Sequence, residues 1–124
     1  MNGVTLTWPG GEHTFALRLG ELRAIQTNRD SGPEEIWNSI RTGTWKADDL
    51  VQVIRFGLVG SGTMKADEAA RFVTPLMDTS PLVQMKLTAL AILANALMGD
   101  LEDAPEKPET EDLPESGSSP TSTE

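Results

Sequence analysis

Residues 80–99 read SPLVQMKLTALAILANALMG, and this stretch decides the fold. Ser80 suits a helix N-cap and Pro81 a first helical residue, while Gly99 supplies a C-terminal stop. Between them, apolar side chains occupy most of the circumference of the predicted helix. Such a helix is buried on several sides, or it turns one side toward another protein. The sequence therefore predicts a helical body built around this segment.

Two helices are predicted directly upstream. The first covers residues 47–58 and carries a single apolar stripe, formed by Leu50, Val53, Ile54, Gly57 and Leu58. Gly60-Ser61-Gly62 is read as its stop and a following loop. The second covers residues 66–73, and Pro75 is expected either to close it or to kink it.

Two shorter helices are predicted before these. Ser31-Gly32-Pro33 is a start signal, because proline is preorganised for the first turn of a helix, and Thr42-Gly43 ends the segment. An earlier helix follows Gly20-Glu21 and is expected to end near Asn28.

The first twenty residues have the pattern of a β-hairpin. Apolar and polar residues alternate over residues 4–8 and again over residues 14–19, which is the period of a half-buried strand. The segment between them, Pro9-Gly10-Gly11-Glu12, is rich in turn residues. The predicted fold is α+β, an N-terminal β-hairpin followed by a four- to five-helix bundle, in one domain over residues 1–99.

The remaining segment, residues 100–124, differs in composition from this body. It holds nine acids against one lysine, and so carries −8 of the formal net charge of −9. It also contains four prolines and only two large apolar residues. Such a segment buries too little apolar surface to offset its ordering entropy, so we expect a disordered acidic tail. Its simplest role is to keep the protein soluble, and a flexible arm that contacts a partner is the alternative.

Composition excludes several kinds of catalytic site. The chain of 124 residues has no cysteine and one histidine, His13, which is expected to be a surface residue at the hairpin turn or at the start of the second strand. The glycine-rich segment over residues 57–62 lacks the lysine and hydroxyl residue that a phosphate-binding loop requires. The acidic pairs Asp48-Asp49 and Asp67-Glu68 fall in first helical turns, where they offset the helix dipole. We expect no enzyme activity, no cofactor and no metal.

Partner classes are limited by charge and hydropathy. No basic stripe is available to offset the phosphates of a nucleic acid, and the longest apolar stretch is too short to span a bilayer. No secretion signal is apparent at the start of the chain, so we expect a soluble, cytoplasmic protein. The three tryptophans, Trp8, Trp37 and Trp45, are expected to be core or boundary anchors.

Three segments, taken in order, resemble the tail proteins of gene transfer agents. The first is residues 13–26, where a strand with a Phe-x-Leu pattern runs into a Gly-Glu-Leu helix start. The second comprises residues 36–40 and 43–50, similar to a helix and the loop that follows it. The third is residues 53–62, similar to the central helix of the family, which is followed by a Glu-Ala helix start at Glu68-Ala69. The resemblance covers residues 4–99 and excludes the acidic segment.

This resemblance implies a role in building the tail of a siphophage-like particle. Proteins of this kind are described both as tail tube proteins and as tail assembly chaperones, which coat the tape-measure protein and recruit tube subunits. The small helical body favours the chaperone, with the tape-measure and tail tube proteins as partners. A structural minor tail or tail tube component is the first alternative, and a small regulatory nucleic-acid-binding domain is the second. A homo-oligomer is left open.

A chaperone of this kind would cover apolar stripes of its partner through helix-in-groove contacts. The candidate contact residues lie in the last helix and in the loop before the third, namely Trp45, Leu87, Leu90, Leu93, Ala94 and Leu97. For the helix positions, burial in the protein's own core is the competing interpretation. For Trp45, an exposed position would indicate an interface.

Overall fold

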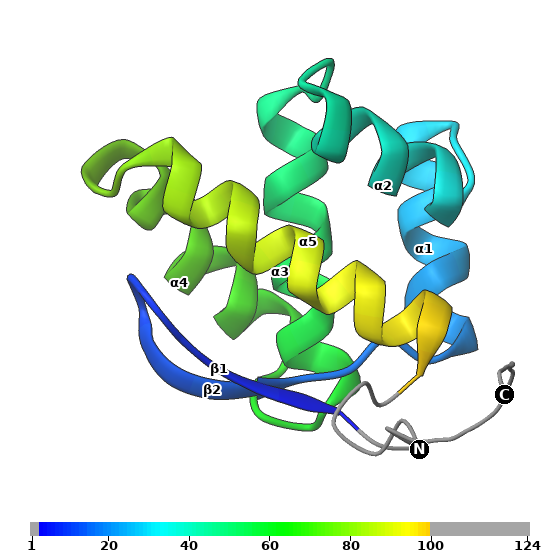
Figure 1. Cartoon of the computed structure of the whole chain (residues 1–124). Helices are drawn as coiled ribbons and strands as arrows, with labels where there is room; N and C mark the ends of the chain where they lie inside the picture. The colour runs from blue at the N-terminus through cyan, green and yellow to red at the C-terminus, as the bar shows by residue number, and fades with distance from the viewer. Residues whose placement is uncertain (1–2, 100–124) are drawn as a thin grey trace, which may run out of the picture.

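A computed structural model describes residues 3–99 of the chain, which form a hairpin followed by five helices. Figure 1 shows the elements in order: β1 (Val4–Trp8), β2 (Gly11–Phe15), α1 (Leu19–Arg29), α2 (Pro33–Thr42), α3 (Ala47–Gly60), α4 (Ala66–Thr79) and α5 (Leu82–Met98). The predicted α+β architecture is thereby confirmed for these residues. The predicted acidic tail lies outside them.

The hairpin is antiparallel and has a two-residue turn, Pro9-Gly10, because Trp8 pairs with Gly11 across it. Gly11 has a φ of 117°, which only glycine adopts readily. The prediction that the second strand extends to residue 19 is wrong. The chain leaves the hairpin after Phe15, where the Ala16 amide donates to the Gly57 carbonyl of α3 at 2.9 Å.

Helix α3 is the centre of the core. It packs against α1, α4, α5 and β2, and α5 crosses in front of it in Figure 1. Its predicted stripe is fully buried, with Leu50, Val53, Ile54 and Leu58 at 0% exposure. The last turn runs to Gly60, two residues beyond the predicted end. Gly62, in the loop that follows, has a φ of 82°.

Two glycines of α3 allow neighbouring segments to approach it closely. A Cβ on Gly57 would lie 3.1 Å from the Phe15 ring and 3.3 Å from Ile92. A Cβ on Gly60 would collide with the carbonyl oxygen of Ala16. The hairpin exit and α5 therefore sit directly against the α3 backbone at these positions.

Two predicted boundaries near α4 and α5 are wrong. Pro75 does not close α4, which continues to Thr79, because proline removes a single internal hydrogen bond while Leu76 and Met77 beyond it pack on the core. Ser80 is the C-cap of α4 rather than the N-cap of α5, and that position belongs to Pro81. The predicted stop of α5 at Gly99 is confirmed.

Hydropathy along the helices gives a further finding. Within residues 3–99, the structure contains no helix whose length and apolar character suit a membrane span.

Candidate functional site

Helix α5 has an inward face that forms part of the core. Five of its residues are buried, namely Met85, Thr88, Ala89, Ile92 and Leu93. Their spacing of three or four residues places them on one side of the helix, which packs against α2, α3 and β1. Of the two predicted arrangements, burial on several sides or one side left open, the buried residues fit the second, because they lie on one side of the helix only.

The opposite side of α5 is apolar as well, and within residues 3–99 it is only partly covered. Its exposed members are Val83 at 59%, Leu87 at 58%, Met98 at 53% and Leu97 at 38%. Three partly buried residues lie among them on the helix surface. We call the whole set the α5 outer face; it consists of Val83, Leu87, Leu90, Ala91, Ala94, Leu97 and Met98.

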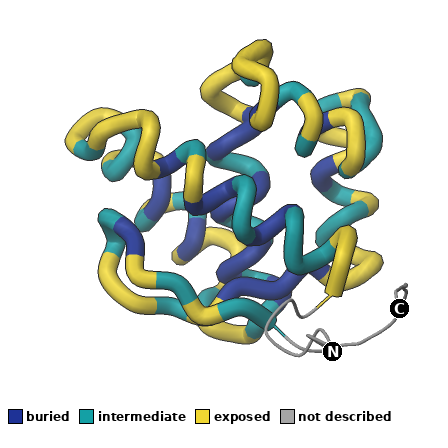
Figure 2. Tube along the Cα trace, in the orientation of Figure 1, coloured by how far each residue is buried: buried dark blue, intermediate teal, exposed yellow. Residues whose placement is uncertain are grey.

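The α5 outer face is uninterrupted by polar residues. At 3.6 residues per turn, its seven members span an arc of about 120° around the helix axis. The polar residues Gln84, Lys86 and Asn95 lie outside this arc. Figure 2 shows both ends of α5 as exposed, with buried positions between them. A soluble domain seldom leaves so continuous an apolar stripe open unless a partner covers it.

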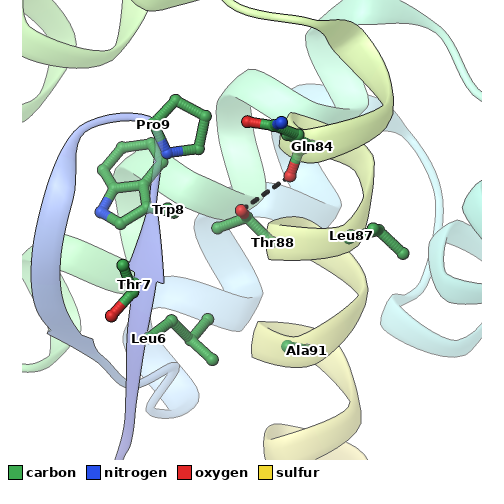
Figure 3. Close-up of a pocket in the computed structure, with 8 residues that line it drawn as sticks. All are labelled: Leu6, Thr7, Trp8, Pro9, Gln84, Leu87, Thr88 and Ala91. Atoms are coloured by element: carbon green, nitrogen blue, oxygen red, sulfur yellow. Dashed lines mark hydrogen bonds between the residues drawn. The ribbon is translucent and has the colours of Figure 1, made fainter.

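A groove lies beside this face, between β1 and α5. It has a volume of about 270 Å³ and is lined by Leu6, Thr7, Trp8, Pro9, Gln84, Leu87, Thr88 and Ala91 (Figure 3). The Thr88 hydroxyl donates to the Gln84 carbonyl at 2.8 Å, so this lining group is already paired within α5. The groove contains no charged side chain. Leu87 and Ala91 belong both to the groove and to the α5 outer face, so the two form one continuous surface.

The six contact residues predicted from the sequence do not all lie on one surface of the structure. Leu87 and Leu97 are exposed, and Leu90 and Ala94 are partly buried, so these four lie together on the α5 outer face. Leu93 is fully buried in the core and presents no surface to a partner. Trp45 lies between α2 and α3, where it is partly buried and packs against the core.

Sequence reasoning missed Val83, Ala91 and Met98 on the helix, and the β1 residues of the groove. The helix residues had a readable signal, because they follow the same spacing as Leu87, Leu90, Ala94 and Leu97. No pattern in the sequence indicated that β1 residues would line the groove. Which strand lies beside α5 depends on the packing of the hairpin, and no local pattern encodes it.

The aromatic cluster of the hairpin accounts for His13. The Trp8 indole N–H donates to His13 Nδ1 at 2.8 Å, and the rings of Phe15 and Phe72 meet the histidine edge-on. His13 therefore lies within β2, paired with Leu6, so of the two predicted positions the second strand is correct and the turn is not. Its side chain is partly buried rather than fully at the surface. Trp8 is buried and Trp37 packs against the core, as predicted.

Both acidic pairs occupy first helical turns, as predicted. In α3, Asp49 accepts from the Lys46 backbone N–H at 2.8 Å and from Arg29 Nε at 2.9 Å. In α4, Glu68 accepts from the Lys65 backbone N–H at 3.5 Å. These acids cap helices. Across the part of the chain that the structure describes, no three histidine or acidic side chains gather in a way that suits a metal ion.

Comparison with known proteins identifies a family that the chain matches. The sequence model of a family described as phage tail tube protein, GTA-gp10, matches residues 2–99. The matched range ends with the C-cap of α5 and leaves out the acidic segment. No curated protein and no solved structure matches the chain.

Proposed function

This chain belongs to the phage tail tube protein family GTA-gp10, and from that premise we propose that it acts as a tail assembly chaperone. The family places the chain in the structure or the assembly of a phage-type tail. The chaperone role, as opposed to a place in the finished tube, is the proposal. Its partners would be the tape-measure protein and the tail tube protein.

The observation that carries this proposal is the α5 outer face together with the groove along β1. A folded domain of this size that leaves one side of its most apolar helix open has a surface suited to another protein. An amphipathic helix binds such a surface through apolar residues spaced three and four apart. A long helical tape-measure protein would supply stripes of this kind.

The strand content supports the chaperone over the tube subunit. Residues 3–99 contain one sheet of two five-residue strands. A subunit that forms a tube by pairing sheets around a ring needs longer and more numerous strands. The description of this family as tail tube proteins favours the structural alternative, a place in the finished tail.

Further parts of the proposal follow from the same role. We propose that the protein is not an enzyme and acts in the cytoplasm, where tails are assembled. Its contribution would be to mask apolar surface on its partners until tube subunits replace it.

Co-expression with the tape-measure protein of the same tail locus tests the proposal. We expect the full chain to keep that protein in the soluble fraction and to co-purify with it. A Leu87→Glu, Leu97→Glu double variant should lose at least about tenfold in affinity, since both residues are exposed anchors of an apolar contact.

Leu19→Glu is the matched control, because Leu19 is 61% exposed and lies on α1 rather than on α5. This variant should bind as the parent chain does. Equal binding by all three proteins would contradict the assignment of the α5 outer face. An absence of co-purification with both tail proteins would contradict the chaperone role.

A further inference from the structure

The two outer edges of the β-hairpin differ in how their backbone groups are paired. In an antiparallel pair of strands, residues that exchange backbone hydrogen bonds alternate with residues whose N–H and C=O groups point outward. The two-residue turn of the hairpin places Thr7 and Glu12 in such an outward pair. Thr5 and Thr14, two residues further from the turn, form the next one. Each strand therefore turns the backbone groups of these residues toward its outer edge.

The outer edge of β2 is covered in part by the loop after α3. The Thr14 carbonyl accepts from the Ser61 hydroxyl at 2.7 Å and from the Thr63 hydroxyl at 3.1 Å. On β1, the backbone N–H and C=O groups of Thr5 and Thr7 have no such partner in the part of the chain that the structure describes. We call these backbone groups the β1 edge.

The groove between β1 and α5 runs along the β1 edge. Side chains of a strand alternate between its two faces, yet the four consecutive residues 6–9 all line the groove (Figure 3). Residues of both faces line one groove where that groove follows the edge of the strand. Leu87 and Ala91 of α5 line its other side, and none of the lining residues is charged.

The chemistry of the β1 edge selects an extended peptide as its occupant. Backbone N–H and C=O groups carry partial charges of opposite sign, and their arrangement along a strand edge is complementary to the backbone of another strand. A helix pairs its backbone groups internally, so it cannot satisfy those of the edge. In an added strand, every second side chain lies on the same sheet face as Leu6 and meets the uncharged groove, so these positions suit apolar residues.

Two occupants that this chain could itself supply lack the required side chains. In residues 100–124 the large apolar residues, Leu101 and Leu113, are twelve positions apart, so they cannot enter the groove from alternate positions of one strand. A second copy could offer its own β1. In that strand, however, Trp8 is buried and Leu6 packs against the core, so neither side chain is available to fill a groove on another molecule.

We propose that the β1 edge binds an extended segment of another protein by strand addition. The bound segment has apolar residues at every second position, and these fill the groove between β1 and α5. Backbone hydrogen bonds to Thr5 and Thr7 hold it in register. The inference goes beyond the proposed chaperone function and does not depend on it.

Backbone hydrogen exchange of the full chain, followed by nuclear magnetic resonance, tests the proposal. The probe is a synthetic peptide of three Thr-Val repeats between two lysines. We expect the Thr5 and Thr7 amides to exchange rapidly in the free chain. They should exchange about tenfold more slowly when the peptide is at ten times its dissociation constant, because a bound amide donates to the peptide. The control peptide has prolines at its two central positions, which removes donors and the extended pairing, and it should leave exchange unchanged.

Proline substitutions on the two strands provide matched protein variants. The outward N–H of Thr7 makes no hydrogen bond to β2, so Thr7→Pro removes a donor of the β1 edge and leaves the hairpin bonds in place. Glu12→Pro removes the outward donor directly opposite, on the edge of β2. We expect Thr7→Pro to weaken peptide binding at least about fivefold and Glu12→Pro to leave it unchanged. Circular dichroism checks that both variants fold, and the proline peptide gives the same comparison without altering the protein.

Several results would overturn the proposal. Slow exchange of the Thr5 and Thr7 amides in the free chain at every concentration would show that the chain covers its own edge. Slow exchange that develops only at high protein concentration would assign the edge to a second copy. No slowing by the alternating peptide, equal slowing by both peptides, or equal weakening by both folded variants would show that β1 does not accept a strand. The chaperone role is judged separately by co-purification with tail proteins, so the two can fail independently.

Discussion

The hydrogen bond between Trp8 and His13 joins the two strands of the hairpin inside an aromatic cluster. Replacing the histidine by phenylalanine keeps a ring at this position and removes the acceptor at Nδ1. The buried indole N–H of Trp8 then lacks its partner, so we expect His13→Phe to lower the free energy of unfolding by about 1–3 kcal/mol. Chemical denaturation measures this change.

The exposed neighbour Glu12 gives the control for this prediction, because it lies in the same strand and makes no side-chain hydrogen bond within the described residues. Glu12→Ala should change stability by no more than about 0.5 kcal/mol. If His13→Phe is as stable as Glu12→Ala, the Trp8–His13 bond contributes nothing to the fold.

Asp49 and Asp67 both lie in the first turn of a helix, but only Asp49 connects two helices. Asp49 is 12% exposed at its side chain and links α1 to α3 through Arg29, whereas Asp67 is 75% exposed and pairs with Arg71 on its own helix. Asp49→Ala leaves the Arg29 guanidinium without its closest partner and removes a helix cap, so we expect a loss of about 1–3 kcal/mol.

Asp67→Ala is the matched control at the surface. It should lower the free energy of unfolding by about 0.5 kcal/mol or less, because exposed ion pairs are screened by water. Thermal unfolding of both variants gives the comparison. A loss as large for Asp67 as for Asp49 would show that the link between α1 and α3 contributes no more than a surface pair.

At the scale of elements, replacing two helical glycines by alanine is expected to change stability in opposite directions. Gly60 meets the hairpin exit at the end of α3, so Gly60→Ala forces two backbone segments apart, and we expect a loss of about 1–3 kcal/mol. Gly20 lies in α1 with open space around it, so Gly20→Ala should stabilise the protein by about 0.5–1 kcal/mol through helix propensity. Changes of the same sign for the two variants, measured by denaturant unfolding, would contradict this packing.

Local signals in the sequence identified most elements. The starts of α2 and α3 were readable because proline and acidic residues have intrinsic preferences for a first turn. The end of β2 was not, because the apolar residues Phe15 and Leu17 continue a strand-like alternation. The hydrogen bond from Ala16 to Gly57 ends the strand, and that contact spans more than forty residues of sequence. The end of α4 was predicted too early for a similar reason, since tertiary packing carries the helix past Pro75 to Thr79.

The candidate site could be predicted only in part, again because tertiary packing decides what local patterns leave open. Helical spacing alone identifies which residues of α5 share a side, but not which side the core takes. Leu93 and Leu90 are equally apolar in the sequence, and only the packing of α3 and α2 against the helix buries the first. Trp45 shows the converse. Its loop position left both a core anchor and an exposed interface residue open, and the structure shows a partly buried ring that packs against the core.

At the scale of the whole molecule, the described core lies within residues 3–99, and most of the net charge lies in residues 100–124. Removing residues 100–124 takes away −8 of the net charge of −9 and none of the residues that form the described core. We expect the 1–99 fragment to keep its helical circular dichroism and its cooperative unfolding. We also expect its solubility at neutral pH to fall, because its net charge is close to zero. A fragment that fails to fold would contradict the division of the chain at residue 99.

The central claim is that this member of a phage tail family assists assembly and then leaves. Quantitative mass spectrometry of purified particles, beside the lysate of the culture that produces them, tests it most directly. The account predicts abundant protein in the lysate and almost none in the particles. A near-stoichiometric amount in finished particles, relative to the major tail protein, would contradict it and make this chain a structural part of the tail.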